Sequence, residues 1–298
     1  MTQVDRTKFI GSSEVAGVLG LSRWTTPLKI WSIKTGAIEA EDISGKEFVE
    51  WGTRLENVVA EKFAEKNNVK LMAYKKRYVH KKYPFLQMEL DRLIVGTDEI
   101  VEVKTCTEWK AKEWDENIPQ EYILQVMFAL CLSGRKIGHL AVLIGGNKYR
   151  EKTILFDEEL YNDMIKKCVY FWEEHVLKNV PPMAVGDDNT FMVDLYPENK
   201  TEDLKVANEE VESWIAHLQE TKMHIKEMKK EADEMESKIK QVIGETAGLK
   251  TEKYVVTWKT QNGAPKYLKA QMINDGVFEE YTEETTRRVM RVKLNKED

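Results

Sequence analysis

Apolar and polar residues follow two different periods along the first 180 residues, and each period predicts one kind of element. Helical spacing and helix-ending residues predict helices over 9–20, 27–36, 46–66, 119–134 and 157 to about 178. Two-residue alternation predicts strands over 69–83, 138–145 and 149–156, and a β-hairpin over 90–105. The polar stretch after this hairpin is expected to be a loop. The order of these elements is typical of an α/β fold with a central sheet flanked by helices.

A seven-residue repeat marks the chain after about residue 201. Two heptad positions carry mostly apolar residues, and their occupants are Val211, Leu218, Ile225, Ala232 and Ile239, with Trp214, Thr221, Met228, Met235 and Val242 offset by three. This pattern predicts a long helix or coiled coil over 201–243 that Gly244 ends. Two strands are expected beyond it, over 253–260, with a turn at 261–263, and over 287–294.

These patterns divide the chain into three parts. Residues 1–182 are expected to form one domain, 183–200 a linker, and 201–298 an extension made of the long helix and a β-hairpin. The extension has similar numbers of acidic and basic residues, which favours an interaction role over catalysis. Arg287, Arg288 and Arg291 are candidates for DNA contacts in this part.

The hairpin over 90–105 carries the chemistry that the rest of the chain is organised around. Glu102 and Lys104 are two residues apart on one strand, so they share a face, while Val103 points to the other. Pairing around the turn at Gly96 would bring Asp91 beside Glu102. Two carboxylates with one ammonium group form a cation site of the kind that suits Mg²⁺ or Mn²⁺. The alternative is a cross-strand salt-bridge cluster on a solvated face.

Four other residues are candidates for a site, each with an ordinary structural alternative. Glu56 adjoins the apolar stripe of its helix, where it either marks the boundary or reaches into a site. Gln125 lies inside an apolar helix and needs a partner, either a backbone carbonyl or a ligand phosphate. Arg6 and Ser13 flank the first helix, at which Ser12 or Ser13 is an ordinary cap or part of a phosphate site.

Aromatic and basic residues are interleaved in two places. Residues 70–82 contain six Lys or Arg residues and no acid, with three tyrosines in or beside them. They fit either an edge that follows phosphates or a solvated strand face. Trp24, next to Arg23, fits either a residue that stacks on an unpaired base or a packing residue between two helices.

Composition narrows the class of protein. The 298 residues are 42% hydrophobic and 32% charged, as in a soluble globular protein, and the net charge of −6 leaves room for a local basic surface. No apolar run reaches membrane length, and the N-terminus lacks the apolar core of a signal peptide. Three widely spaced cysteines form no metal pattern or disulfide framework, so a reducing cytosol is expected.

In combination, these features resemble the YqaJ-type viral recombinases, the lambda-exonuclease branch of the PD-(D/E)XK, or restriction-endonuclease-like, nucleases. The resemblance covers residues 1–180, about three-fifths of the chain, and implies a central mixed sheet flanked by helices. It is carried by the opening IGSSEVAGVLGLSRWTTPLKIWSIKTG, the WGTRLE block with Glu56, the LD of Asp91, the EVK of 102–104 and the YILQ that ends at Gln125. The C-terminal helix and strands more loosely resemble extensions of phage-type members.

The resemblance implies roles for these residues. Asp91 and Glu102, with the main-chain carbonyl of Val103, look like the metal ligands, and Glu56 matches the helix acid that reaches the metal region. Lys104 matches the catalytic lysine. Positions that hold a terminal phosphate are matched by Arg6, Ser13 and Gln125. One departure is Glu89, which stands where that branch has a serine in the phosphate pocket, and a carboxylate there would repel a 5′-phosphate.

The resemblance also implies an activity and partners. We expect a Mg²⁺-dependent deoxyribonuclease, with Mn²⁺ as a possible substitute, that digests linear double-stranded DNA 5′→3′ for phage-type recombination. Expected partners are DNA ends, a single-strand annealing protein and further copies of the chain in a trimer, in the cytoplasm of a bacterial host of a phage or prophage. The alternatives are a nicking or end-trimming endonuclease of the same fold and a non-catalytic DNA-end binder or coiled-coil adaptor.

Overall fold

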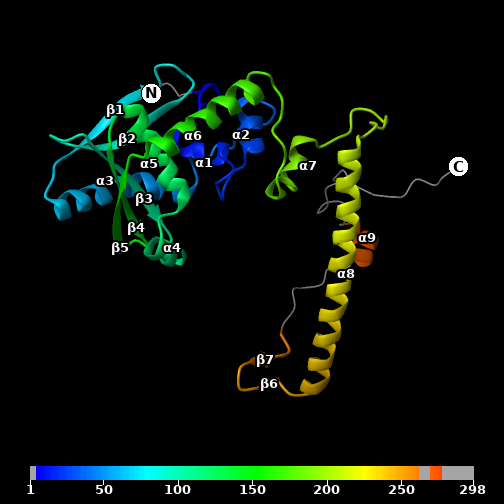
Figure 1. Cartoon of the computed structure of the whole chain (residues 1–298). Coiled ribbons are helices and arrows are strands. Elements are labelled where there is room, and N and C mark those ends of the chain that lie inside the picture. The colour runs from blue at the N-terminus through cyan, green and yellow to red at the C-terminus, as the bar shows by residue number, and fades with distance from the viewer. Residues whose placement is uncertain (1–4, 262–268, 277–298) are drawn as a thin grey trace. The chain divides into compact units, whose positions relative to one another are not determined.

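A computed structural model describes residues 5–261 and 269–276 and divides the chain into two compact units between Pro197 and Glu198 (Figure 1). The first unit contains the central sheet, and the second contains the long helix α8 (Glu209–Ile243). Each unit is described by itself. No helix among the described residues is long and apolar enough to span a membrane.

The first unit is built on a five-stranded mixed sheet in which the strands lie in chain order. The strands are β1 (Leu71–Val79), β2 (Gln87–Ile94), β3 (Glu99–Cys106), β4 (Ile137–Ile144) and β5 (Lys148–Leu155). Neighbours pair antiparallel except β3 and β4, which are parallel. A parallel pair needs a crossover, and the crossover here contains α4 (Ala111–Glu116) and α5 (Gln120–Ser133). The mixed sheet expected from the sequence is confirmed.

Helices cover both faces of this sheet (Figure 1). One face packs against α5, with α1 (Val15–Val18), α2 (Pro27–Lys34) and α6 (Glu158–Tyr170) in the same core. The other face packs against α3 (Glu47–Asn67) through a smaller apolar cluster. The close approach of α5 depends on Gly138 of β4, because a Cβ at that position would lie 2.5 Å from Cγ1 of Val126.

The edge strand β1 is irregular. Its pairing with β2 shifts register between Ala73 and Tyr74 and again between Tyr74 and Tyr78. Such a bulge bends the strand and redirects its side chains. Arg77 lies within this irregular segment, and its guanidinium group contacts Glu89 on β2.

Two local expectations near the start and middle of the unit are corrected. The first helix is a short turn, η2 (Ser12–Glu14), followed by α1, and neither serine caps it because both lie inside the turn. The carboxylate of Glu14 instead accepts a hydrogen bond from the Gly11 N–H group. The stretch after the hairpin is not a plain loop, since it contains η3 (Glu108–Lys110) and α4, which buries Trp114.

The remaining helix ends follow the sequence signals. The hydroxyl of Thr26 caps α2, and the carboxylate of Asp157 caps α6. Gly134 ends α5 at a φ of 70°, a left-handed conformation that favours glycine. The helix expected over 157–178 changes after Tyr170 from α6 to a π-helical segment, η4 (Phe171–Val176).

The expected linker over 183–200 is corrected as well. It contains η5 (Gly186–Asp188) and α7 (Phe191–Leu195), and residues up to Pro197 belong to the first unit. Apolar side chains of α7 pack against the main core, and Asp188 is fully buried. Its carboxylate accepts hydrogen bonds from the Thr26 hydroxyl and the Val185 N–H group. This contact ties the end of the unit to the start of α2.

Asp188→Ala is expected to destabilise the first unit by about 2–4 kcal/mol, because it leaves the buried Thr26 hydroxyl and the Val185 N–H group without their acceptor. Denaturant unfolding followed by circular dichroism measures the change. Asp187→Ala is the matched control, since Asp187 is exposed. Equal unfolding free energies for the two variants would contradict the prediction.

The described part of the second unit contains α8, a small hairpin and α9 (Lys269–Asn274). The long helix is present, but it begins at Glu209, eight residues later than expected, where the Asn208 side chain caps it. Several heptad residues on it are exposed, among them Ile225 and Met228. The hairpin pairs β6 (Gly248–Lys250) with β7 (Val255–Thr257), so the first expected strand pairs with an earlier segment. The expected strand over 287–294, with Arg287, Arg288 and Arg291, lies outside the described residues.

Candidate active site

The β2–β3 hairpin brings two carboxylates and one lysine together. The strands pair at Arg92 with Val101 and at Leu93 with Ile100. At the next position, Oδ2 of Asp91 accepts a hydrogen bond of 2.9 Å from the Val103 N–H group. The Lys104 ammonium group donates a 2.6 Å hydrogen bond to Oε1 of Glu102. The i and i+2 residues of β3 therefore share one face of the sheet, next to the carboxylate of β2.

Burial and mutual repulsion shift the charges of this cluster. Burial, assisted by the negative charge of Glu102, raises the pKa of Asp91 from 3.8 to about 7. Burial alone would lower the pKa of Lys104, but the charges of Glu102 and Asp91 outweigh it and raise that pKa. Lys104 is therefore a cation at neutral pH that pairs with Glu102, while Asp91, with a pKa of about 7, is about half ionised at that pH. The remaining negative charge makes the cluster attractive to a metal cation.

Gln125 on α5 completes the inner layer of the cluster. Its Nε2 group donates a hydrogen bond of 2.5 Å to the same oxygen of Glu102 that binds Lys104. The partner of this amide is thus a carboxylate, and not the backbone carbonyl that the sequence left open. With two donors on one oxygen, the Glu102 side chain, which is only 6% exposed, is held in one orientation.

Glu56 lies close to this cluster but faces a different partner. Its Oε1 accepts a 2.6 Å hydrogen bond from Nη1 of Arg92, and the same nitrogen also donates to the Asp91 main-chain carbonyl. Across residues 5–261 and 269–276, no three His, Cys, Asp or Glu side chains form a joint metal-binding group. The Glu56 carboxylate is thus held by Arg92 in this structure, and its expected role as a further metal ligand stays a prediction. Arg92 was missed, although its place directly after Asp91 turns it toward α3.

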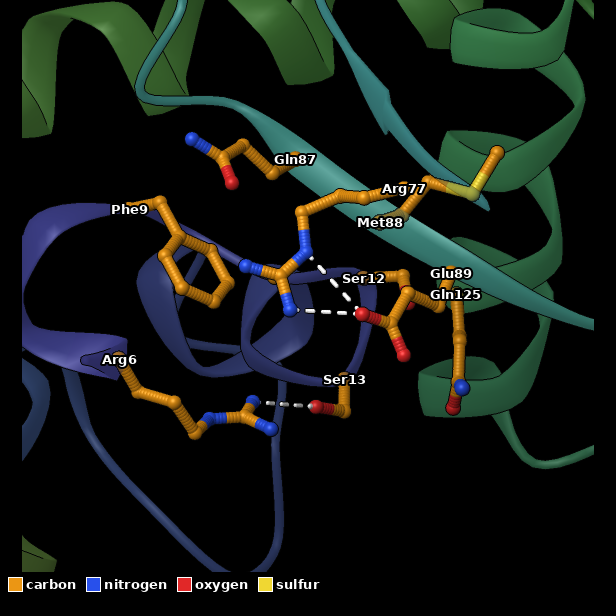
Figure 2. Close-up of a pocket in the computed structure, with 10 residues that line it drawn as sticks. Arg6, Phe9, Ser12, Ser13, Arg77, Gln87, Met88, Glu89 and Gln125 are labelled. Carbon is orange, nitrogen blue, oxygen red and sulfur yellow. Dashed lines mark hydrogen bonds and ion pairs between the residues drawn. The ribbon is translucent and has the colours of Figure 1, made fainter. Parts of the chain in front are cut away.

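A pocket of about 420 Å³ opens beside the carboxylate cluster, to which Gln125 connects it. Figure 2 shows the residues that line this pocket. It brings together the three residues expected to hold a terminal phosphate, Arg6, Ser13 and Gln125. Nη2 of Arg6 donates a 3.2 Å hydrogen bond to the Ser13 hydroxyl. Gln125 belongs to both places, since it lines the pocket and binds Glu102. The pocket also contains Glu89, whose side chain forms an ion pair with Arg77.

A buried ion pair supports the Arg6 side of this pocket. The Lys34 side chain is fully buried. Its ammonium group donates hydrogen bonds to Glu14 at 2.7 Å and to the Arg6 carbonyl at 2.6 Å. Burial lowers the pKa of Lys34, although Glu14 opposes this effect. Lys34 has little signal in the sequence, where it is only a basic residue on the buried side of a helix. Its contacts fix the segment that carries Arg6.

Trp24 lies at the surface near the cluster. It is 53% exposed, with Arg23 at 5.5 Å and Lys110 at 5.2 Å from its ring. Its ring lies 5.9 Å from that of Tyr122, which in turn lies 5.5 Å from the Lys104 nitrogen. Trp24 thus presents an exposed aromatic face, flanked by cations, one ring away from Lys104.

Comparison with known protein sequences shows the family of this chain. The family model described as the YqaJ-like viral recombinase domain matches residues 3–136. Over 265 residues the chain is 34% identical to the uncharacterized protein YqaJ of Bacillus subtilis. This alignment covers 86% of this chain and 82% of the relative. The chain therefore belongs to the YqaJ-like viral recombinase family.

Solved structures share the fold of the first unit. One is the alkaline exonuclease LHK-Exo in complex with dAMP, with a TM-score of 0.50 and 17% identity over 59% of this chain and 91% of the other. Another structure of this exonuclease, from Laribacter hongkongensis, has a TM-score of 0.49 and 16% identity over the same shares. At this identity the first of these matches shows the fold alone, and it agrees with the expected central mixed sheet flanked by helices.

Proposed function

We propose that this protein is a metal-dependent DNA exonuclease of the lambda-exonuclease type. It hydrolyses linear double-stranded DNA in the 5′→3′ direction and leaves single strands for phage-type recombination. The observation that carries the proposal is the crowded pair Asp91 and Glu102 with Lys104 at 2.6 Å from Glu102. Family membership and a fold shared with an alkaline exonuclease support it.

The residues of the cluster fit a divalent metal such as Mg²⁺, with Mn²⁺ as a substitute. Asp91 and Glu102 supply oxygen ligands, and the Val103 carbonyl is proposed as a third. Mg²⁺ commonly uses one or two carboxylates together with water and substrate phosphates, so a third protein carboxylate is not needed. When bound, the metal lowers the pKa of a water molecule and neutralises charge on the scissile phosphate. Glu56 acts through its charge and through Arg92, which it holds beside Asp91.

Lys104 contributes a positive charge next to the scissile phosphate. The neighbouring carboxylates raise its pKa, and as a cation it stabilises charge and orients water. Gln125 keeps Glu102 in place and at the same time lines the pocket. That pocket, with Arg6 and Ser13, holds the end of the strand next to the bond that is cleaved.

Trp24 is proposed to stack on an unpaired base at the duplex end. We expect Trp24→Ala to lower kcat/KM on duplex ends by about tenfold, since stacking of one base on an aromatic ring contributes about 1–3 kcal/mol. Trp214→Ala is the matched control, because Trp214 is exposed to a similar degree, 48%, and lies in the second unit. Unchanged turnover by a folded Trp24→Ala protein would contradict the stacking role.

The proposal is tested with linear duplex DNA labelled at either the 5′ or the 3′ end, digested with Mg²⁺ or with EDTA. Metal-dependent release of the 5′ label as mononucleotides, with closed circles intact, is the expected result. Cleavage of closed circles would instead indicate the endonuclease of the same fold. End binding without cleavage in Mg²⁺ or Mn²⁺ would indicate a binding protein.

Two partners follow from the family relationship and are proposals as well. One is a single-strand annealing protein that receives the product strand. The other is further copies of this chain, in a trimer that encloses the duplex. Size-exclusion chromatography with light scattering measures the second directly.

A further inference from the structure

The pocket beside the catalytic cluster contains a carboxylate of its own. Glu89 precedes Asp91 by two residues on β2, so both side chains lie on one face of the strand. Gln125 joins the pocket to the cluster from the other side, because it lines the pocket and binds Glu102. Under the proposed function, on which this inference rests, whatever group ends the strand must therefore lie close to Glu89.

Glu89 also occupies one of the two guanidinium groups that face this pocket. Nε and Nη2 of Arg77 donate hydrogen bonds of 3.1 and 2.6 Å, both to Oε1 of Glu89 (Figure 2). The Arg77 side chain is 27% exposed, and its guanidinium group lies 5.0 Å from the ring of Phe9. Arg77 is thus held between the ring and the carboxylate, where a ligand must compete with Glu89 for it.

A terminal phosphate meets two obstacles in this arrangement. It carries a charge of about −1.5 to −2 at pH 7, which Glu89 repels. Two unit charges about 5 Å apart, at an effective dielectric constant near 20, change an equilibrium by a few hundred-fold. Solvent and salt screen most of this effect for Glu89, whose side chain is 60% exposed, so a preference of about threefold to tenfold is expected. To reach Arg77, the phosphate must also displace Glu89. The Arg6 guanidinium group, which binds Ser13, is the cation that remains for it.

A hydroxyl group meets neither obstacle. It carries no charge, can donate a hydrogen bond to the Glu89 carboxylate and can accept one from Arg6. We propose that Glu89, paired with Arg77, sets the substrate class of this pocket, which selects a strand end that bears a hydroxyl group over one that bears a phosphate. Glu89 and Arg77 are then specificity-determining residues for the end of the DNA strand.

The test compares two duplexes that differ only in a 5′-hydroxyl or a 5′-phosphate. Binding is measured by fluorescence anisotropy in EDTA, and hydrolysis is measured in parallel with Mg²⁺. We expect the full-length protein to bind the hydroxyl end at least about threefold more tightly and to hydrolyse it faster. Tighter or equal binding of the phosphate end would overturn the proposal. Absence of hydrolysis of both duplexes would refute the proposed function, while the binding ratio still tests the pocket.

Two variants locate the preference in the ion pair. Glu89→Gln removes the charge from a side chain that is 60% exposed, so the fold is expected to persist. The ratio of phosphate to hydroxyl affinity is expected to rise about tenfold in Glu89→Gln, because Arg77 becomes available to the phosphate. Adding Arg77→Gln to this variant should remove most of that gain.

A general gain in DNA affinity from lost negative charge cancels in the ratio, and a control variant checks this point. Glu50→Gln also removes a carboxylate from a surface Glu–Arg pair, with Arg54, outside the pocket. It is expected to leave the phosphate-to-hydroxyl ratio within about twofold of the wild type, since it lies away from the strand end. A ratio that does not change in Glu89→Gln would overturn the role of this carboxylate.

Discussion

Asp91→Asn is expected to abolish metal-dependent hydrolysis of linear duplex DNA and, in the same protein, to raise thermal stability in EDTA. Loss of one of two carboxylate ligands should lower hydrolysis by at least about 10³-fold, since a bound metal contributes several kcal/mol to the barrier. The opposite effect on stability follows from the crowded charge, because the pKa of Asp91 is raised from 3.8 to about 7.

The size of the stability gain follows from that shift. Each pKa unit corresponds to about 1.4 kcal/mol, so the shift sets an upper limit of about 4 kcal/mol, and we expect about half of it after relaxation. The pKa of Asp91 in the folded state lies above its unfolded value. Ionisation of Asp91 therefore lowers the unfolding free energy of the wild type as the pH rises from about 4 to about 7. The gain of Asp91→Asn in EDTA should therefore be larger at pH 8 than at pH 5.

Thermal unfolding with EDTA at both pH values, and then with excess Mg²⁺, measures these effects. Mg²⁺ should stabilise the wild type and not Asp91→Asn, since binding to the folded state alone raises stability. Asp98→Asn is the matched control, because Asp98 is exposed in the turn of the same hairpin. If Asp91→Asn were less stable than the wild type in EDTA, the Asp91 carboxylate would have a structural role and would not be a destabilising metal ligand.

Lys104→Ala is expected to lower hydrolysis by about 10²–10⁴-fold, because it removes a cation that stabilises charge or orients water at the reacting phosphate. Its effect on stability in EDTA should be opposite to that of Asp91→Asn. Without the ammonium group at 2.6 Å, Glu102 and Asp91 repel each other with no compensating charge. In EDTA, thermal stability should thus rise in Asp91→Asn and fall in Lys104→Ala, which distinguishes the role of the carboxylate from that of the ammonium group.

End-labelled DNA, with nicked and closed circles alongside, measures the activity of Lys104→Ala, and anisotropy measures its binding of duplex ends. DNA binding should persist, since one lysine among many cations is lost. Lys167→Ala is the control, because Lys167 forms an exposed ion pair with Asp163 on α6. Hydrolysis by Lys104→Ala at a wild-type rate would exclude a catalytic role for this lysine.

The parts of the site that are local in sequence could be predicted. Glu102 and Lys104 share a face because a strand alternates with a period of two, and a turn at Gly96 is enough to bring Asp91 opposite. Local signals also predicted the helix start at Pro27, the cap at Asp157 and the helix end at Gly134. In these cases the interacting groups lie within a few residues, so the pattern contains both partners.

The parts that depend on distant partners could not be predicted. Arg77 binds Glu89 from a segment of β1 in which the register shifts, and the residue alternation does not indicate this irregularity. Likewise, Arg92 of β2 binds Glu56 of α3, and the sequence pattern does not indicate that these two residues are partners. The partner of β7 was missed for the same reason, since it is the short segment Gly248–Lys250.

The irregular edge strand has a further consequence for how this protein associates. A regular edge strand offers a row of backbone donors and acceptors that a second chain can extend, and natural proteins block this with bulges and exposed charges. Here β1 is interrupted by its register shifts, and β5 at the other edge exposes Lys148 and Arg150. Both edges thus resist strand addition. A partner chain would therefore have to contact side-chain surfaces of this unit, since β-augmentation of the sheet is disfavoured.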